Sequence, residues 1–296
     1  MLAKTIAAAL DAAAAKYPSR VALISPFQTT EKLTFEDLVN KTNALAGFLT
    51  AYGYEKSDLL VSDLPNTSEN LMLQIACNRV GIHYGTAKTL ETMAHFPKVK
   101  GAVSATSSGF LAETGLSLPY LSGEYLQDLI GGGGLEEFSL ERFADPSEDD
   151  TPHAFYNTTT PYTNQQALAH GREAAEELIM IEDDVVCISV TLCHPFGMGS
   201  AVCAALERGA SMVLPAVGGI QGCGVPSERA EATLEVLENE KCTLLFADTH
   251  TLKALPDDKP ERLHLRGGIC KIGSGSTFLE ETRKYGGVSL KTMGKA

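Results

Sequence analysis

The 296-residue chain has no tryptophan, and aromatic residues make up only 7% of it. No apolar run approaches the roughly 20 residues that a membrane-spanning helix requires. Basic residues are also scarce, because 24 Lys and Arg stand against 37 Asp and Glu, giving a net charge of −13 and a pI near 5.0. This acidic balance argues against nucleic acid or anionic lipid as the main partner.

Several chemical motifs are missing as well. The sequence contains no Cys-x-x-Cys pair and no Cys/His spacing typical of zinc, so we expect no metal site. It contains neither GxGxxG nor GxSxG, which leaves a dinucleotide oxidoreductase or a serine hydrolase without support. The seven cysteines are odd in number and lie mostly in apolar segments. We therefore expect buried free thiols in a reducing compartment rather than disulfides.

The composition that remains is that of a globular protein. Hydrophobic residues make up 44% and charged residues 21%, enough for a sizeable core in two domains or one large one. Helical and strand-like patterns alternate along the chain, which predicts an α/β fold with parallel sheets covered on both faces. The predicted helices are residues 5–17, 35–52, 68–79, 122–129, 164–178, 200–208, 226–240, 249–255 and 277–284. The predicted strands are residues 21–25, 33–35, 58–62, 81–84, 100–105, 154–158, 185–190, 211–214, 242–247, 268–272 and 288–290.

The segment from Ala154 to Arg172, AFYNTTTPYTNQQALAHGR, is a turn from a strand into a helix. Such turns hold phosphate in α/β proteins, because the helix N-terminus presents free N–H groups and a positive dipole end. The segment resembles the phosphate-binding motif SGTTGxPKG…LTH of the adenylate-forming superfamily, which includes acyl-CoA synthetases, adenylation domains and luciferases. In a gapless alignment Asn157 falls at the serine, and Thr159 and Thr160 keep the two threonines. Leu168 and His170 keep the tail of the motif.

The departures from this motif fall at its chemically demanding positions. Thr158, Pro161 and Gln165 replace the three glycines, Thr163 replaces the proline, and Asn164 replaces the lysine. A β-branched threonine resists the positive φ that glycine allows, and proline has no N–H to offer a phosphate. Asn164 brings no positive charge. The sequence therefore favours an ordinary surface turn over an ATP site, and we expect no cofactor.

Three further runs resemble the same superfamily. Residues 33–85 are similar to its LTYxEL…GxxxGDRVxxxxPNxxE…LAxxxxGxxxxP run. TLCHPFGMGSAVCAALERGASMVLP is similar to the PLFHxxG…GA…VLP segment that lines the acyl or aryl pocket. LRGGICKIGSGS is similar to the LRGGxxAGSP run of medium-chain acyl-CoA synthetases. The resemblance implies an acyl pocket around His194, Phe196 and Gly197, although a lone histidine in an apolar setting is more often a satisfied core residue.

The resemblance covers nearly all of the chain. Residues 290–296 fall where the family has YGxTE; Gly294 matches the glycine, but the threonine and the metal-binding glutamate are absent. The ribose-binding aspartate and the C-terminal lid with its lysine would lie beyond Ala296. The resemblance implies two Rossmann-like, doubly wound parallel-sheet subdomains without the family's barrel and lid. One would comprise residues 61–170, and the other residues 1–60 plus 171–296.

These observations predict a catalytically inactive, acyl-CoA-synthetase-like protein with no catalytic residue, because nothing supplies the charge stabilisation that adenylation requires. We expect it to be a structural or accessory subunit that binds other protein subunits, without direct transmembrane contact. Analogy with the family's medium-chain members suggests a mitochondrial assembly, with the cytoplasm as the alternative. Two functional alternatives stay open: a module that binds an acyl chain or acyl-CoA, and a ligase completed by a partner chain.

Overall fold

The structure is a computed structural model that describes residues 3–26, 32–86, 99–104, 120–135, 137–138, 153–156, 161–215, 225–256 and 263–295. The helices are α1 (Ile6–Lys16), α2 (Phe35–Ala51), α3 (Ser68–Val80), α6 (Gly123–Gly131), α7 (Asn164–Glu177), the π-helix η1 (Pro195–Cys203), α8 (Ala204–Arg208), α9 (Pro226–Asn239) and α10 (Thr249–Ala254). The strands are β1 (Val21–Ile24), β2 (Lys32–Thr34), β3 (Leu59–Ser62), β4 (His83–Thr86), β5 (Val99–Ser104), β6 (Tyr120–Ser122), β7 (His153–Tyr156), β8 (Pro161–Thr163), β9 (Val185–Ser189), β10 (Ser211–Val213), β11 (Leu244–Asp248), β12 (Gly267–Ile272), β13 (Thr277–Tyr285) and β14 (Val288–Gly294).

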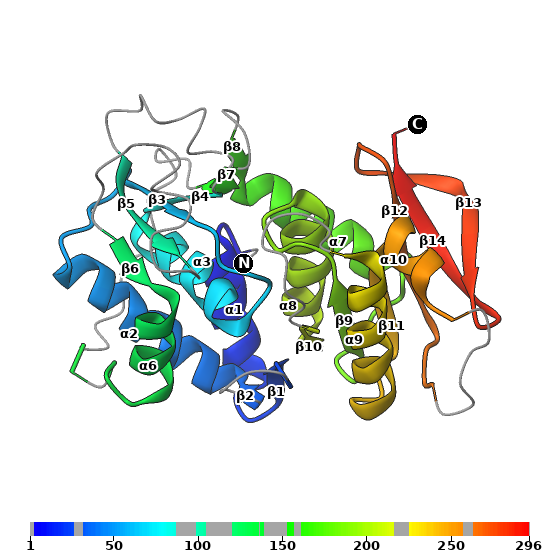
Figure 1. Cartoon of the computed structure of the whole chain (residues 1–296), viewed down its shortest axis with the longest axis horizontal. Coiled ribbons are helices and arrows are strands. Elements are labelled where there is room, and N and C mark those ends of the chain that lie inside the picture. The colour runs from blue at the N-terminus through cyan, green and yellow to red at the C-terminus, as the bar shows by residue number, and fades with distance from the viewer. Residues whose placement is uncertain are drawn as a thin grey trace.

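The strands form two sheets (Figure 1). The eight-stranded sheet has the order β13-β14-β12-β11-β9-β10-β1-β2, and the six-stranded sheet has the order β6-β5-β3-β4-β7-β8. All pairings are parallel except β13–β14, β1–β2 and β7–β8, which lie at the edges. This confirms the predicted α/β fold with parallel sheets, and the described residues contain no closed barrel. The subdomain limits 61–170 and 1–60 plus 171–296 stay a prediction.

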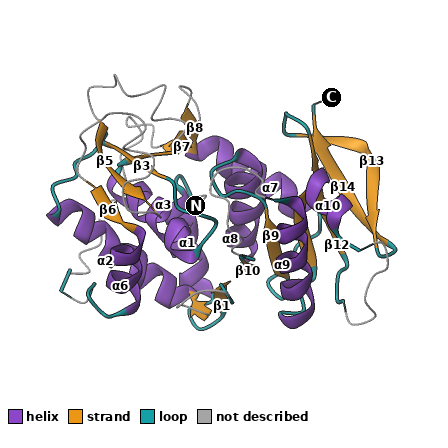
Figure 2. Cartoon of the chain, in the orientation of Figure 1, coloured by secondary structure: helices purple, strands orange, loops and turns teal. Residues whose placement is uncertain are grey.

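The two sheets share one hydrophobic core. Helices α1, α3, α7 and α8 lie between the sheets (Figure 2). Their buried side chains join Leu60 and Tyr84 of the six-stranded sheet to Ile188 and Phe246 of the eight-stranded sheet. A second core lies beneath α9 and α10 on the other face of the eight-stranded sheet. The eight-stranded sheet is therefore covered on both faces, as the alternating pattern predicts.

Several predicted helix ends are confirmed by their caps. Thr34 and Asp37 form a reciprocal capping box at the start of α2, with N···O distances of 2.9 and 3.1 Å. Thr5 caps α1, and Gly209 ends α8 in the left-handed conformation at φ 72°. A Cβ at Gly209 would lie 2.3 Å from the ring of Tyr17, so this turn needs glycine for space as well as for φ.

The predicted helix at residues 277–284 is wrong, because these residues form β13, which pairs antiparallel with β14. The cause is the turn that follows. Gly286 and Gly287 have φ of 53° and 78°, the pattern of a type I′ turn, and Tyr285 pairs with Val288 across it. Such a two-residue turn requires strands on both sides, which outweighs the helical propensity of the charged residues before it.

The described part of the chain also bears on the cysteines and on membrane insertion. Six cysteines are buried and free, as expected: Cys77, Cys187, Cys193, Cys203, Cys242 and Cys270. Cys223 lies outside the described residues. No described helix has the length and apolar character that crossing a membrane requires.

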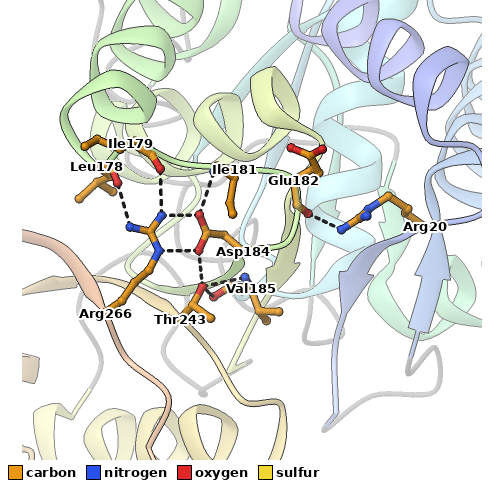
Figure 3. Close-up of polar contacts among 9 residues, drawn as sticks. All are labelled: Arg20, Leu178, Ile179, Ile181, Glu182, Asp184, Val185, Thr243 and Arg266. Atoms are coloured by element: carbon orange, nitrogen blue, oxygen red, sulfur yellow. Dashed lines mark hydrogen bonds and ion pairs between the residues drawn. The ribbon is translucent and has the colours of Figure 1, made fainter.

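An ion pair with a buried carboxylate anchors the amino ends of three strands of the eight-stranded sheet (Figure 3). Asp184, just before β9, accepts from Arg266 Nε at 2.8 Å and from Arg266 Nη2 at 2.5 Å. The Thr243 hydroxyl and the Ile181 N–H also donate to this carboxylate, at 2.7 and 2.9 Å. Arg266 further donates to two carbonyls of the turn after α7. Arg266 belongs to the LRGG run and acts here as a structural residue.

Candidate functional site

The predicted phosphate loop lies between β7 and β8, at the carboxyl end of β7. Residues 157–160, which include Thr158, Thr159 and Thr160, lie outside the described residues. Pro161 begins β8, a strand that was not predicted, and pairs with Tyr156 of β7. α7 then starts at the predicted Asn164. Its N-cap, Thr163, forms a capping box that the sequence analysis missed, although the spacing Thr-x-x-Gln signals it.

Asn164, at the position of the motif's lysine, is a core residue that is 2% exposed. Its Oδ1 accepts from the Ile6 N–H at 2.9 Å and from Asn78 Nδ2 at 3.0 Å. The Asn78 Oδ1 in turn accepts from the Ala7 N–H at 3.1 Å. The Thr5 side chain accepts from the free N–H of Ala8, and the Thr5 carbonyl accepts the first intrahelical bond, from the Ala9 N–H. The two asparagines therefore complete the N-terminal cap of α1 and join it to α3 and α7.

A tyrosine–histidine pair follows on the same hairpin and helix. The Tyr162 hydroxyl lies 2.7 Å from His170 Nδ1, and the two rings stack with centroids 5.7 Å apart. Burial lowers the pKa of His170, and the charge of Lys271 lowers it further. Gly199 of η1 approaches Tyr162 so closely that a Cβ there would lie 2.1 Å from the hydroxyl oxygen. The glycine thus lets η1 pack directly against the tyrosine.

His194 caps η1 instead of forming a catalytic dyad with Cys193. The Phe196 N–H donates to His194 Nδ1 at 3.1 Å, so the neutral ring carries its proton on Nε2. Burial, together with the charge of Lys271, lowers the pKa of His194 to about 4. Cys193 contacts Gln74 at 3.6 Å, and burial raises the pKa of its thiol to about 12. A neutral thiol of this kind is not a nucleophile at neutral pH.

The other two residues of the expected acyl pocket contribute to packing. Phe196 is buried against Phe246, with ring centroids 5.7 Å apart. At Gly197 a Cβ would lie 2.1 Å from the Thr191 carbonyl oxygen, so the first turn of η1 requires this glycine. π-helices often occur at functional sites. The assignment of His194, Phe196 and Gly197 to an acyl pocket stays a prediction.

Lys271 on β12 is the functional candidate that the sequence analysis missed. Its side chain is buried, and its ammonium donates to the Gly275 carbonyl. Burial lowers its pKa, and its charge lowers the pKa values of His170 and His194. The structure thus brings three basic side chains to the carboxyl edge of the eight-stranded sheet. The sequence signal that could have indicated Lys271 is a lysine within an otherwise apolar strand. Within the described ranges, no cluster of His, Cys, Asp and Glu could hold a metal ion.

A Gly199→Ala variant is expected to lose about 1–3 kcal/mol of unfolding free energy, because the new methyl group must displace the buried Tyr162 hydroxyl. Tyr162→Phe removes that oxygen. The double variant should therefore be more stable than the sum of the two single changes predicts, as measured by urea unfolding. Additive losses in this cycle would show that the Gly199–Tyr162 contact does not limit the packing of η1.

Comparison with known proteins agrees with this geometry. Residues 10–93 match the family model described as AMP-binding enzyme. The inhibitor-bound N-terminal domain of FACL13 from Mycobacterium tuberculosis superposes with a TM-score of 0.72 at 15% identity, covering 91% of this chain and 70% of that chain. VinN superposes with a TM-score of 0.70 at 15% identity, covering 92% and 70%. A search among curated proteins gave no match.

These findings define the class: the chain has the α/β fold of the N-terminal domain of adenylate-forming enzymes. In fold it resembles in particular the N-terminal part of acyl-CoA synthetases, and residues 10–93 resemble the AMP-binding family model. A Mycobacterium tuberculosis fatty acyl CoA synthetase superposes with a TM-score of 0.72 at 15% identity, covering 92% of this chain and 55% of that chain. The chain thus spans about half the length of that synthetase. The resemblance predicted from the sequence motifs is confirmed.

Proposed function

We propose that this chain is a catalytically inactive relative of acyl-CoA synthetases that serves as an accessory subunit of a larger protein assembly. The observation that carries the proposal is the burial of Asn164. Its amide completes the cap of α1, so the residue at the position of the motif's lysine contributes to packing and offers no charge to a nucleotide. Adenylation needs cations and dipoles around the transferring phosphate.

Lys271 does not compensate for this loss. Its ammonium is buried and directed to the Gly275 carbonyl, and burial lowers its pKa. An ammonium held by a carbonyl of its own chain offers little of its charge to a nucleotide phosphate. Burial and the charge of Lys271 lower the pKa values of His170 and His194, which disfavours the charged forms of both histidines.

Exposed apolar side chains support a role within an assembly. Ile179 is 79% exposed and Ile181 49% exposed, both in the turn that Arg266 anchors, and Tyr52 and Tyr125 are about half exposed beside Phe48. Apolar side chains gathered at a surface are typical of protein–protein contacts. The host assembly is proposed to be mitochondrial by analogy with medium-chain acyl-CoA synthetases, and a cytoplasmic host is the alternative.

The proposal predicts that isothermal titration calorimetry with Mg²⁺ and about millimolar ATP gives no binding heat for the purified chain. An active acyl-CoA synthetase in the same buffer serves as the positive control. Micromolar binding would contradict the inactive assignment and favour the alternative of a ligase completed by a partner chain. Native mass spectrometry on the same sample tests the acyl-binding alternative, which a retained acyl chain or acyl-CoA would support.

The subunit role is tested separately in the source cells. The chain should be recovered as a stoichiometric component of a large particle after native fractionation. A stable, solitary monomer in the same fractions would contradict the accessory role, even if ATP binding is absent.

A further inference from the structure

The turn after α7 holds an isoleucine in an unfavourable backbone conformation. Ile179 follows the C-cap Leu178 and has φ of 48°, in the left-handed region. Its N–H donates to the Glu176 carbonyl at 3.0 Å, and the Met180 N–H donates to the Ala175 carbonyl at 2.9 Å. This is the Schellman arrangement that ends many helices, in which the left-handed residue is usually glycine. A β-branched residue there is an outlier that destabilises the fold.

The folded chain gains little from this isoleucine in return. The Ile179 side chain is 79% exposed, so it buries little apolar surface. Glycine or asparagine would adopt the same conformation with less strain. Ile181, two residues further, is also exposed, at 49%. Strained backbone is typical of functional sites, and apolar side chains gathered at a surface are typical of contact sites. Both features meet in this turn.

Hydrogen bonds hold the turn in one conformation. Arg266 donates to the Leu178 and Ile179 carbonyls at 3.0 and 3.2 Å (Figure 3). The Ile181 N–H donates to the Asp184 carboxylate at 2.9 Å, and Asp184 is bound to Arg266 in turn. Strain persists where the surrounding structure fixes the backbone in this way. A turn that is already ordered also loses little conformational entropy when it docks. The two isoleucines are therefore preorganised anchors.

Acidic residues flank these anchors. The exposed acids on the two sides of the turn are Glu176, Glu177, Glu182 and Asp183. Lys291 pairs with Glu177 at 3.1 Å, and Arg20 pairs with Asp183 at 2.8 Å. Among the described residues, no salt bridge involves Glu176 or Glu182. These two glutamates make the rim of the turn negative, in a chain whose net charge is −13.

We propose that this turn docks into an apolar pocket with a basic rim on another protein subunit, with Ile179 as the central anchor. The inference rests on the proposed accessory role and names the contact through which that role is carried out. A buried apolar anchor within a polar rim is the usual anatomy of an interface, and complementary charge selects the partner.

The negative rim also excludes other occupants. In a symmetric contact between two copies, Glu176 and Glu182 would face the same acidic rim of the second copy, which is repulsive. Nucleic acid and anionic membranes carry the same sign of charge as the turn. The chemistry that complements two fixed isoleucines between acids is therefore a protein surface that combines apolar side chains with Lys or Arg.

An Ile179→Asn variant tests the anchor with two measurements. In cells that lack the endogenous chain, native fractionation should show at least about a tenfold loss of the variant from the large particle. Urea unfolding of the purified variant should show a higher midpoint than that of the unmodified chain, because asparagine tolerates the left-handed conformation. A residue that only supported the fold would lower the midpoint. Opposite directions in the two measurements identify a docking residue.

Matched controls lie at the other end of the eight-stranded sheet. The turn after α7 lies at the amino ends of the strands, whereas α9 ends before β11 and therefore begins near the carboxyl ends. Val225→Asn removes an apolar side chain that is 51% exposed just before α9, and it should leave incorporation unchanged. Glu176→Lys should weaken incorporation, whereas Glu231→Lys, at an exposed position of α9, should not.

Photo-cross-linking identifies the occupant. Ile181→p-benzoylphenylalanine in the intact particle should cross-link to one subunit, at a segment that combines apolar residues with Lys or Arg. A cross-link to a second copy of this chain or to an acidic segment would overturn the proposal.

The outcomes separate this contact from the accessory role. If Ile179→Asn enters the particle as well as the unmodified chain, or lowers the urea midpoint, the docking contact is wrong and the accessory role stands. The same holds if the Val225→Asn or Glu231→Lys control is lost from the particle to the same extent. If the unmodified chain is recovered only as a monomer, both are wrong.

Discussion

An Asn164→Lys variant is expected to lose about 3 kcal/mol or more of unfolding free energy and to gain no affinity for ATP. The substitution restores the residue type of the phosphate motif but places an ammonium group in the core. It also removes the acceptor for the Ile6 N–H and for the Asn78 amide. Both donors lose this acceptor while α1, α3 and α7 stay packed. Urea unfolding measures the loss, and calorimetry with Mg²⁺ and ATP measures the affinity.

Gln165→Lys is the matched control for this variant. Gln165 is the next residue of α7 and is exposed, so the same new charge should change stability by no more than about 0.5 kcal/mol. If Asn164→Lys were as stable as the Gln165→Lys control, the position would tolerate a lysine and the capping role would be wrong. If it bound ATP, the loop would be a phosphate site that lacks only its charge.

An Asp184→Ala variant is expected to lose about 3 kcal/mol of unfolding free energy at neutral pH. The carboxylate is 3% exposed and receives hydrogen bonds from Arg266, Thr243 and the Ile181 N–H (Figure 3). Removing it leaves the Ile181 N–H without its acceptor and leaves the partly buried Thr243 hydroxyl with the Val185 carbonyl at 3.5 Å. Arg266 is 40% exposed and keeps its carbonyl partners, so its charge remains partly hydrated after the substitution. The expected loss of unfolding free energy therefore lies near the lower end of the range for breaking a buried ion pair.

The difference between Asp184→Ala and the unmodified chain should depend on pH. Burial by itself would raise the pKa of Asp184, but the hydrogen bonds from Arg266, Ile181 and Thr243 outweigh it, so the pKa lies below its usual value. A carboxyl group whose pKa is lower in the folded state stabilises the fold. This stabilisation is fully present above the unfolded pKa of about 3.9 and is lost as pH falls through the folded pKa. The stability difference should therefore be constant from neutral pH to about pH 5 and shrink below about pH 4.

Asp183→Ala is the neighbouring control. Asp183 is 76% exposed and pairs with Arg20 at 2.8 Å on the surface. Such a pair is worth at most about 1 kcal/mol, and salt weakens it further. Equal losses from the two neighbouring alanine variants would contradict a special role for the buried carboxylate, as would an Asp184→Ala loss that stays unchanged at acid pH.

Features set by neighbouring residues could be predicted from the sequence. Thr34 and Asp37 lie three residues apart before an apolar pattern, and the structure confirms their capping box. Nearly all of the predicted helices and strands are present for the same reason, because periodicity and caps are local signals. The family resemblance also rested on short sequence motifs, and the fold that it implied is confirmed.

Features set by distant contacts could not be predicted. Asn164 looks like a degraded loop residue in the sequence, and only its bonds to α1 and α3 show that it belongs to the core. η1 depends on the close approach of Gly199 to Tyr162, a contact that residue spacing in the sequence does not predict. The error at β13 is different, because the pair Gly286–Gly287 is a local sequence signal for a hairpin.

The cap of α1 also has a consequence for the order in which the chain folds. The acceptors for the first two N–H groups of this helix come from residues 158 and 71 positions further along the chain. During synthesis α1 emerges before α3 and α7, so the Ile6 N–H lacks its protein acceptor until Asn164, 158 residues later, has been made. Closing so long a loop must precede the gain from its contacts. The N-terminal cap of α1 is therefore completed only after both α3 and α7 have been made and have packed against it.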